Sequence, residues 1–203
     1  MKQLSLITIL TIQLLSQPQP ISLNPGDDKV KIDTNRLRSI HLMSDEGNNV
    51  DLENYKSSKA IVFIFLSPEC PISQKYAITM ENIHNKYAAR DIKFFGVFSD
   101  DYADSSVAST FKKEYNIGFP MLLDKDYLIA DLTDATITPE VCIIDSNGVL
   151  QYRGMIDNWF VALGKKRRVI TKNYLDEALE CISNNKEVEI PYNKAVGCFL
   201  HLN

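Results

Sequence analysis

The sequence predicts an α/β sandwich in which helices flank a central mixed sheet. In the first half of the 203 residues, continuous apolar runs alternate with helical patterns. Such runs are typical of parallel strands that are buried on both faces. In the second half, a hairpin signal precedes a final helix. An antiparallel pair at one edge of the sheet is normal in folds of this class, so the predicted sheet is mixed.

Three apolar runs in the first half predict strands, at residues 40–43, 60–66 and 92–98. A helix is expected over 71–89, because Pro71 suits the first turn of a helix, where its missing N–H would have no partner. Four apolar residues at helical spacing form one stripe along this segment: Tyr76, Met80, Ile83 and Tyr87. The second strand and this helix are therefore joined by only a short turn.

The second half predicts further elements in the same manner. They are, in order, a helix over 103–115, a strand over 119–123, a short helix over 126–132, two strands over 140–145 and 149–154, and a helix over 171–184. Gly118 is expected to end the first of these helices. The turn Ser146-Asn147-Gly148 predicts a hairpin, and Thr171 is the expected cap of the last helix.

The two ends of the chain differ from the middle. Residues 1–22 are expected to be a signal peptide, because the apolar stretch 4–15 fits a signal core and is too short to span a bilayer. The cleavage site is ambiguous, and an uncleaved anchor or a disordered tail is the alternative. We expect an exported protein, periplasmic or extracytoplasmic, without a stable membrane span after processing. A linker over 23–38, one domain over 39–185 and a tail over 186–203 complete the predicted organisation.

Composition excludes several classes of function. The formal net charge of −4 implies no particular partner. The basic cluster Lys165–Arg168 is more typical of a solvated surface than of a nucleic-acid site, so no nucleic acid is expected. The sequence has no phosphate-binding glycine loop and no haem attachment motif, and no cofactor is expected. Four cysteines in an exported protein permit disulfides without requiring them.

Cys70 is the candidate nucleophile. It follows the strand over 60–66 and immediately precedes Pro71, so it lies at the N-terminus of the predicted helix. Unpaired N–H groups and the helix dipole favour the thiolate there, and the thiolate is the reactive form. The negative charge of the neighbouring Glu69 carboxylate disfavours the Cys70 thiolate. The alternative is a small hydrophobic residue that merely ends a strand.

Two motifs resemble the thioredoxin-like superfamily. The sequence CPIS at 70–73 resembles its active-site corner, and Thr138-Pro139 resembles its cis-proline loop. Three segments are similar to the redoxin (AhpC/TSA) branch, which includes peroxiredoxins and exported thiol–disulfide oxidoreductases: GVFSDD at 96–101, FPMLLD at 119–124 and TPEVCIIDSNGVLQYRGMID at 138–157. The resemblance covers about residues 40–183. It implies a three-layer thioredoxin-like sandwich whose cis-proline loop packs against Cys70 and offers backbone groups to a bound peptide.

The motifs depart from the family patterns at several positions. Ser73 stands where thioredoxin-type oxidoreductases have a second cysteine, and we expect it to steady the thiolate. Ser67 matches the hydroxyl residue that precedes a peroxidatic cysteine by three positions, but Phe63 stands where a proline is expected. Arg153 lies two residues beyond the position of the family's peroxide-orienting arginine and is a candidate substitute. The candidate substrate-binding residues are Pro71, Thr138, Pro139 and Arg153.

Cys198 lies in the apolar tail, where Gly197 allows a turn toward the domain. It is either a thiol that resolves an intermediate on Cys70 or a structural or free thiol, and the sequence favours neither. The leading hypothesis is an exported thiol–disulfide oxidoreductase that acts on protein disulfides or small thiols and uses an external thiol reductant. A lone cysteine forms a mixed disulfide but needs a second thiol to release it.

Two other functions stay open. One is an antioxidant thiol peroxidase that uses Ser67, Cys70 and Arg153 to consume peroxides. The other is a non-enzymatic module that binds Cu(I) through Cys70, Cys198 and His201, since sulfur and imidazole ligands suit that ion. Of the two remaining cysteines, Cys142 is expected to be buried and unreactive and Cys181 to be partly buried at the border of the apolar face of the last helix, and a bridge between them is possible.

Overall fold

The computed structural model describes residues 30–100 and 104–200. The expected signal peptide over 1–22 and His201 lie outside these residues. Within the described ranges, no helix is long and apolar enough to cross a membrane.

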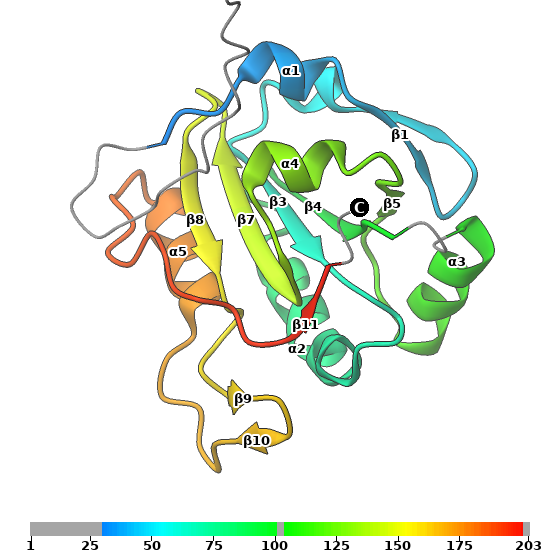
Figure 1. The fold of residues 1–203 in the computed structure, drawn as a ribbon. Coiled ribbons are helices and arrows are strands. Elements are labelled where there is room, and N and C mark those ends of the chain that lie inside the picture. Colours follow the sequence, from blue (N-terminus) through cyan, green and yellow to red (C-terminus); the bar gives the residue numbers. More distant parts are fainter. Residues whose placement is uncertain (1–29, 101–103, 201–203) are drawn as a thin grey trace, which may run out of the picture.

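The centre of the fold is a mixed sheet of seven strands in the order β2-β1-β5-β4-β3-β7-β8 (Figure 1). The bounds of these strands in that order are Asn49–Asp51, His41–Ser44, Met121–Leu123, Ile92–Phe98, Ala60–Phe65, Glu140–Asp145 and Leu150–Gly154. Strand β4 runs parallel to both β3 and β5. Strand β7 pairs antiparallel with β3, and β8 pairs antiparallel with β7 at the edge of the sheet. The predicted mixed sheet is confirmed.

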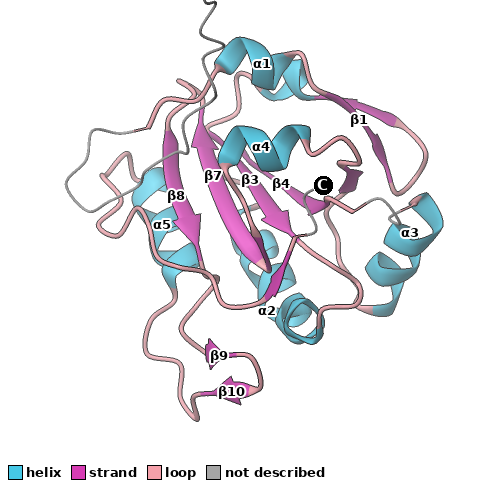
Figure 2. Cartoon of the chain, viewed as in Figure 1, coloured by secondary structure: helices cyan, strands magenta, loops and turns pink. Residues whose placement is uncertain are grey.

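Helices cover both faces of the sheet, as the secondary-structure view shows (Figure 2). They are α1 (Thr34–Arg38), the 3₁₀ helix η1 (Leu52–Tyr55), α2 (Pro71–Tyr87), α3 (Ser105–Glu114), α4 (Leu128–Thr133) and α5 (Tyr174–Ser183). Helices α2, α3 and α5 contribute to one buried hydrophobic cluster, whereas α1, η1 and α4 contribute to the other. The protein is therefore the predicted α/β sandwich of three layers.

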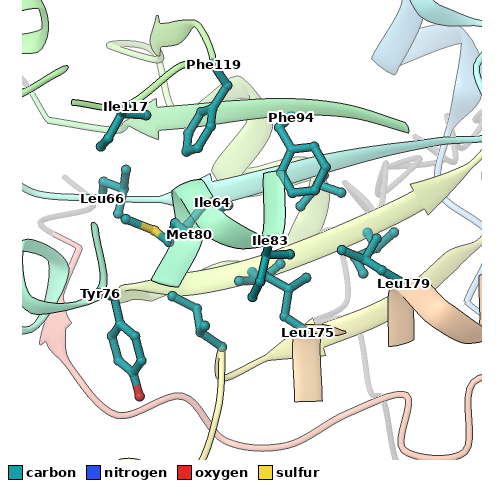
Figure 3. Packing of buried hydrophobic residues seen from close by; sticks show 14 of the residues in the cluster. Ile64, Leu66, Tyr76, Met80, Ile83, Phe94, Ile117, Phe119, Leu175 and Leu179 are labelled. Atoms are coloured by element: carbon teal, nitrogen blue, oxygen red, sulfur yellow. The ribbon is translucent and has the colours of Figure 1, made fainter. Parts of the chain in front are cut away.

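Strand β3 supplies both clusters, because alternate side chains of a strand point to opposite faces. Val62 and Ile64 pack on the side of α2, and Phe63 and Phe65 pack on the side of α4. In Figure 3, Met80 and Ile83 of the predicted α2 stripe lie beneath the sheet, with Leu175 and Leu179 of α5 nearby, and Tyr76 belongs to the same buried cluster. All six residues of β3 are buried, as the continuous apolar run predicts.

Part of the expected linker over 23–38 belongs to the folded domain. Asp33 caps α1, since its carboxylate accepts hydrogen bonds from the backbone N–H groups of Asn35 and Arg36. Ile32 and Leu37 are buried in the cluster on this face of the sheet. Burial of these two side chains holds in place a segment whose polar composition is typical of a linker.

Residues 186–200 of the expected tail over 186–203 also belong to the folded domain. Tyr192 forms a parallel bridge with Arg153 of β8, and the chain then forms β11 (Cys198–Phe199) against β6 (Ile137–Thr138). Figure 1 shows this segment, in red, crossing from β8 to the N-terminal end of α2. Backbone pairing with β8 and β6 holds this segment in place, and no local pattern in the sequence predicts pairing between strands that are so far apart.

Smaller differences concern the region before α5. The helix begins at Tyr174 with Asn173 as its cap residue, whereas Thr171 bonds to Asn158 instead. The strands β9 (Phe160–Ala162) and β10 (Lys165–Lys166) form a small hairpin that the sequence did not predict. The basic cluster lies in and just after this hairpin, and all four of its side chains are exposed.

Candidate active site

Cys70 is held at the junction between β3 and α2. The backbone N–H of Cys70 donates to the carbonyl of Ser67 at 3.1 Å, which closes a turn, and Pro71 then begins the helix. Only 1% of Cys70 is exposed. The sequence prediction that this residue lies at a helix N-terminus is confirmed.

The loop before β7 packs directly against this cysteine. The peptide bond between Thr138 and Pro139 is cis, and both residues are buried. The Cys70 thiol lies 3.1 Å from the carbonyl oxygen of Thr138, to which it donates a hydrogen bond. The loop that the resemblance identified thus forms one wall of the site.

The other wall is β11, which brings a second thiol to Cys70. Cys198 pairs with Thr138 in the antiparallel register, and its Sγ lies 3.0 Å from the Sγ of Cys70. This separation is longer than a disulfide bond of about 2.05 Å, and both cysteines are free. Two thiols that are 128 residues apart in the sequence are therefore in contact.

Gly197 makes this approach possible. A Cβ atom at position 197 would lie 2.0 Å from the carbonyl oxygen of Thr138, a distance that no side chain can occupy. The backbone N–H of Leu200 donates to the carbonyl of Thr136 at 2.9 Å and continues the pairing beyond Cys198. The glycine that the sequence marked as a turn residue acts here through close backbone approach.

The environment of the two thiols makes them chemically different. Burial favours the neutral Cys70 thiol, but the hydrogen bond from Cys198 and the backbone N–H groups of Ser73 and Ile72 outweigh burial and lower the pKa of Cys70. Burial and the neighbouring Cys70 sulfur raise the pKa of Cys198 to about 11. Cys70 is thus the more acidic thiol of the pair, and Cys198 donates a hydrogen bond to its sulfur.

This asymmetry predicts the pH dependence of alkylation at Cys70. The rate of reaction with iodoacetamide should reach its plateau at a lower pH than that of an ordinary cysteine, since only the thiolate reacts. In Cys198→Ala the pH profile should shift upward, because the alanine methyl group donates no hydrogen bond to the Cys70 sulfur. Mass spectrometry of the labelled Cys70 peptide across a pH series measures both profiles. An unchanged profile in the variant would contradict the assigned role of the hydrogen bond.

The hydroxyl groups of Ser67 and Ser73 form hydrogen bonds within the turn that precedes Cys70 and α2. The hydroxyl of Ser73 accepts a hydrogen bond from the backbone N–H of Ser67 at 3.4 Å, and the Ser67 hydroxyl accepts from the backbone N–H of Glu69 at 3.3 Å. Ser73 was expected to steady the thiolate through its side chain, but its N–H group is what lowers the pKa of Cys70. The amide of Ile72, which sequence reasoning missed, contributes in the same way. Pro71 is exposed at the start of α2 beside the buried thiol.

The guanidinium of Arg153 forms a separate network of hydrogen bonds and ion pairs. Its guanidinium donates to the backbone carbonyls of Thr133 and Asp134 and to the Asp134 carboxylate, at 2.9–3.1 Å. It also lies 3.9 Å from the buried carboxylate of Glu140 and 5.1 Å from the centre of the Tyr192 ring. These contacts give Arg153 a structural role at the end of α4, in place of the expected contact with a substrate.

This role predicts that Arg153→Met destabilises the fold by about 3 kcal/mol or more, because the buried charge of Glu140 loses its partner. Urea unfolding measures the change. Arg90 pairs with Glu180 at the surface at 3.4 Å, and Arg90→Met is the matched control with an expected cost below about 1 kcal/mol. Equal stability of the two variants would contradict the structural assignment.

The remaining cysteines lie apart from this pair. Cys142 is fully buried in β7, and burial raises the pKa of its thiol strongly, which agrees with the expected lack of reactivity. Cys181 on α5 is half-buried, and both thiols are free, so the possible bridge between them is not formed. Among residues 30–100 and 104–200 there is no group of three histidine, cysteine or acidic side chains that could hold a metal ion.

Comparisons with known proteins agree with this geometry. The model of the AhpC/TSA family matches residues 34–153. Peroxiredoxin Bcp of Bacillus subtilis is 22% identical over 148 residues, which are 73% of this chain and 92% of the relative.

Two solved structures show the same fold. A hypothetical protein of Sinorhizobium meliloti 1021 matches with a TM-score of 0.73 and 22% identity, over 92% of this chain and 99% of the other. A secreted disulfide oxidoreductase of Mycobacterium tuberculosis matches with a TM-score of 0.53 and 18% identity, over 75% of this chain and 99% of the other. The predicted thioredoxin-like fold is confirmed.

Proposed function

Because this chain belongs to the AhpC/TSA family, whose model covers more than half of it, we propose that it is an exported thiol–disulfide oxidoreductase with Cys70 as its nucleophile and Cys198 as its resolving thiol. The observation that carries the proposal is the distance of 3.0 Å between the two sulfur atoms. Members of this family are redox enzymes, and the chain is an oxidoreductase of redoxin type.

The proposed reaction is an exchange of two electrons. The Cys70 thiolate attacks one sulfur of a substrate disulfide, forms a mixed disulfide and releases the other substrate sulfur as a thiolate. Cys198 then loses its proton and attacks the Cys70 sulfur, which releases the remaining substrate thiolate and leaves a Cys70–Cys198 disulfide. Two equivalents of an external thiol return the enzyme to its dithiol form. The substrate is reduced and the external thiol is oxidised.

The roles of the two thiols follow from their pKa values. The lowered pKa of Cys70 makes it the first nucleophile, whereas Cys198, with its raised pKa, stays protonated until an intermediate forms. Loss of the Cys70 negative charge in the mixed disulfide removes one of the causes that raise the pKa of Cys198. The second attack is thereby favoured only after the first has occurred.

The substrate class is a protein disulfide or an oxidised small thiol. In this proposal the loop at Thr138 and Pro139, with Pro71 across from it, shapes the approach to Cys70. Export is proposed from the sequence of residues 1–22, whose apolar core is typical of a signal peptide. The oxidising compartments that such peptides lead to are also those in which disulfide exchange has substrates.

A thiol peroxidase is the second candidate, and the lowered pKa of Cys70 together with the peroxiredoxin relative favours it. In that reaction Cys70 attacks the peroxide, becomes a sulfenic acid and releases water or an alcohol. Cys198 then attacks the sulfenic sulfur, a second water leaves, and the same disulfide forms. Ser67 is the hydroxyl residue near Cys70 in this scheme, while Arg153 is engaged elsewhere.

The two candidates differ in which oxidant the reduced protein consumes. Stopped-flow fluorescence or quenched mass spectrometry would compare oxidation of the reduced protein by glutathione disulfide and by hydrogen peroxide, at equal concentrations. We expect faster formation of the Cys70–Cys198 disulfide with the disulfide oxidant. A rate constant with peroxide that exceeds the other by orders of magnitude would favour the peroxidase and overturn the leading proposal.

A further inference from the structure

The segment between α5 and Cys198 is fixed to the domain before it reaches the active site. The backbone N–H of Arg153 donates to the carbonyl of Pro191 at 2.9 Å, and the N–H of Asn193 donates to the carbonyl of Arg153 at 3.1 Å. From there, Lys194 is exposed and Ala195 is buried before the chain joins β6 at Cys198. Only four residues therefore separate Asn193 from the second thiol.

The oxygen and the nitrogen of the Asn193 side-chain amide both form hydrogen bonds near the end of β8. Its Oδ1 accepts a hydrogen bond from the backbone N–H of Met155 at 2.8 Å, and its Nδ2 donates to the hydroxyl oxygen of Tyr152 at 2.9 Å. That hydroxyl in turn donates to the carbonyl of Met155. Tyr152 is fully buried, and burial raises the pKa of its phenol well above the ordinary value, so it stays neutral. A side chain that is a donor at one end and an acceptor at the other is required here.

Gly154 provides the space for this anchor. Its φ of +150° lies in a region that favours glycine. A Cβ atom there would lie 2.4 Å from both the carbonyl and the Oδ1 of Asn193. The absence of a side chain at Gly154 thus allows Asn193, five positions before Cys198 in the sequence, to approach the end of β8.

We infer that Asn193 is a positioning residue for Cys198, and that its amide clamp on Tyr152 and Met155 sets the effective concentration of the second thiol at Cys70. The inference rests on the proposed two-cysteine reaction. A thiol held near its target reacts as if it were present at a high concentration, and this advantage falls when its tether becomes mobile. Release of the clamp removes the side-chain hydrogen bonds that hold the segment before β11, so the reduced tail, although still paired with β6 and with the backbone of Arg153, gains conformational freedom.

The test is the equilibrium between the protein dithiol and glutathione disulfide, which yields the Cys70–Cys198 disulfide and two molecules of glutathione. Asn193→Asp keeps the shape of the side chain but removes the donor to Tyr152, and Tyr152→Phe removes the acceptor. We expect each variant to lower the equilibrium constant about tenfold, the size that corresponds to one lost buried hydrogen bond. Lys194→Ala, at the exposed neighbouring position, is the matched control and should match the wild type.

A second measurement separates positioning from general stability. Displacement of Cys198 should move the pH profile of Cys70 alkylation upward in Asn193→Asp, and this shift should vanish when Cys198→Ala is already present. An equilibrium constant and a profile that both equal those of the wild type would overturn the inference while leaving the two-cysteine reaction intact. Failure of the wild type itself to form the disulfide would overturn both.

Discussion

Replacing Cys70 by serine is expected to abolish disulfide cleavage, with turnover lower by about 10⁴-fold or more, as for other covalent nucleophiles. A serine hydroxyl at this position stays protonated at neutral pH, so neither the helix N-terminus nor the donated hydrogen bond can make it reactive. The assay follows reduction of a disulfide-bonded peptide with an excess of an external thiol. The peroxidase alternative predicts the same loss for peroxide consumption, because both reactions begin at this sulfur.

The control for this variant is Cys181→Ser, which removes a half-buried thiol on α5, away from the cis-proline loop. Its turnover should remain within about twofold of the wild type, in line with the small effects of most surface changes. Residual activity in Cys70→Ser together with loss in the control would contradict the assignment of the nucleophile and transfer it to another cysteine.

Replacing Cys198 by serine is expected to trap the reaction at its first intermediate. Cys70 still attacks the substrate, but the mixed disulfide has no neighbouring thiol to release it, and one equivalent of product appears in a burst. Steady turnover should fall by about 100-fold, because an external thiol at millimolar concentration replaces one held in place. Mass spectrometry of the quenched reaction should show the substrate joined to Cys70.

An added thiol is expected to restore the turnover of Cys198→Ser. Raising the concentration of dithiothreitol should restore turnover in proportion, since release of the mixed disulfide is then the slow step. The wild type should respond much less, because Cys198 carries out that release from within the molecule. Turnover of Cys198→Ser equal to that of the wild type at a low concentration of external thiol would show that the second cysteine has no part in the reaction.

Local patterns predicted the first half of the site. The apolar run of β3, the proline after Cys70 and the periodic stripe of α2 are all properties of neighbouring residues, and the structure has them as expected. The cis bond at Thr138-Pro139 was implied by the family resemblance. In each case the determining interactions lie within a few residues of the feature.

The second half of the site, which contains Cys198, depends on contacts between segments that are distant in the sequence. The pairing of Cys198 with Thr138 follows from β11 crossing the domain, and the sequence offered only Gly197 as a signal. The contacts that Ser73 and Arg153 form were not predicted for a related reason, because residue type suggests side-chain chemistry. In the structure, Ser73 acts on Cys70 through its backbone, and Arg153 is held by acceptors from α4 and β7.

Whether Cys70 and Cys198 form one redox pair can be tested with a non-reducing peptide map. The full chain would be digested before and after treatment with one equivalent of a mild oxidant, with thiols blocked at each stage. The account predicts a new peptide that joins Cys70 to Cys198 and disappears on addition of dithiothreitol. A Cys70 that stays free or becomes only a sulfenic acid, with Cys198 unmodified, would contradict the account.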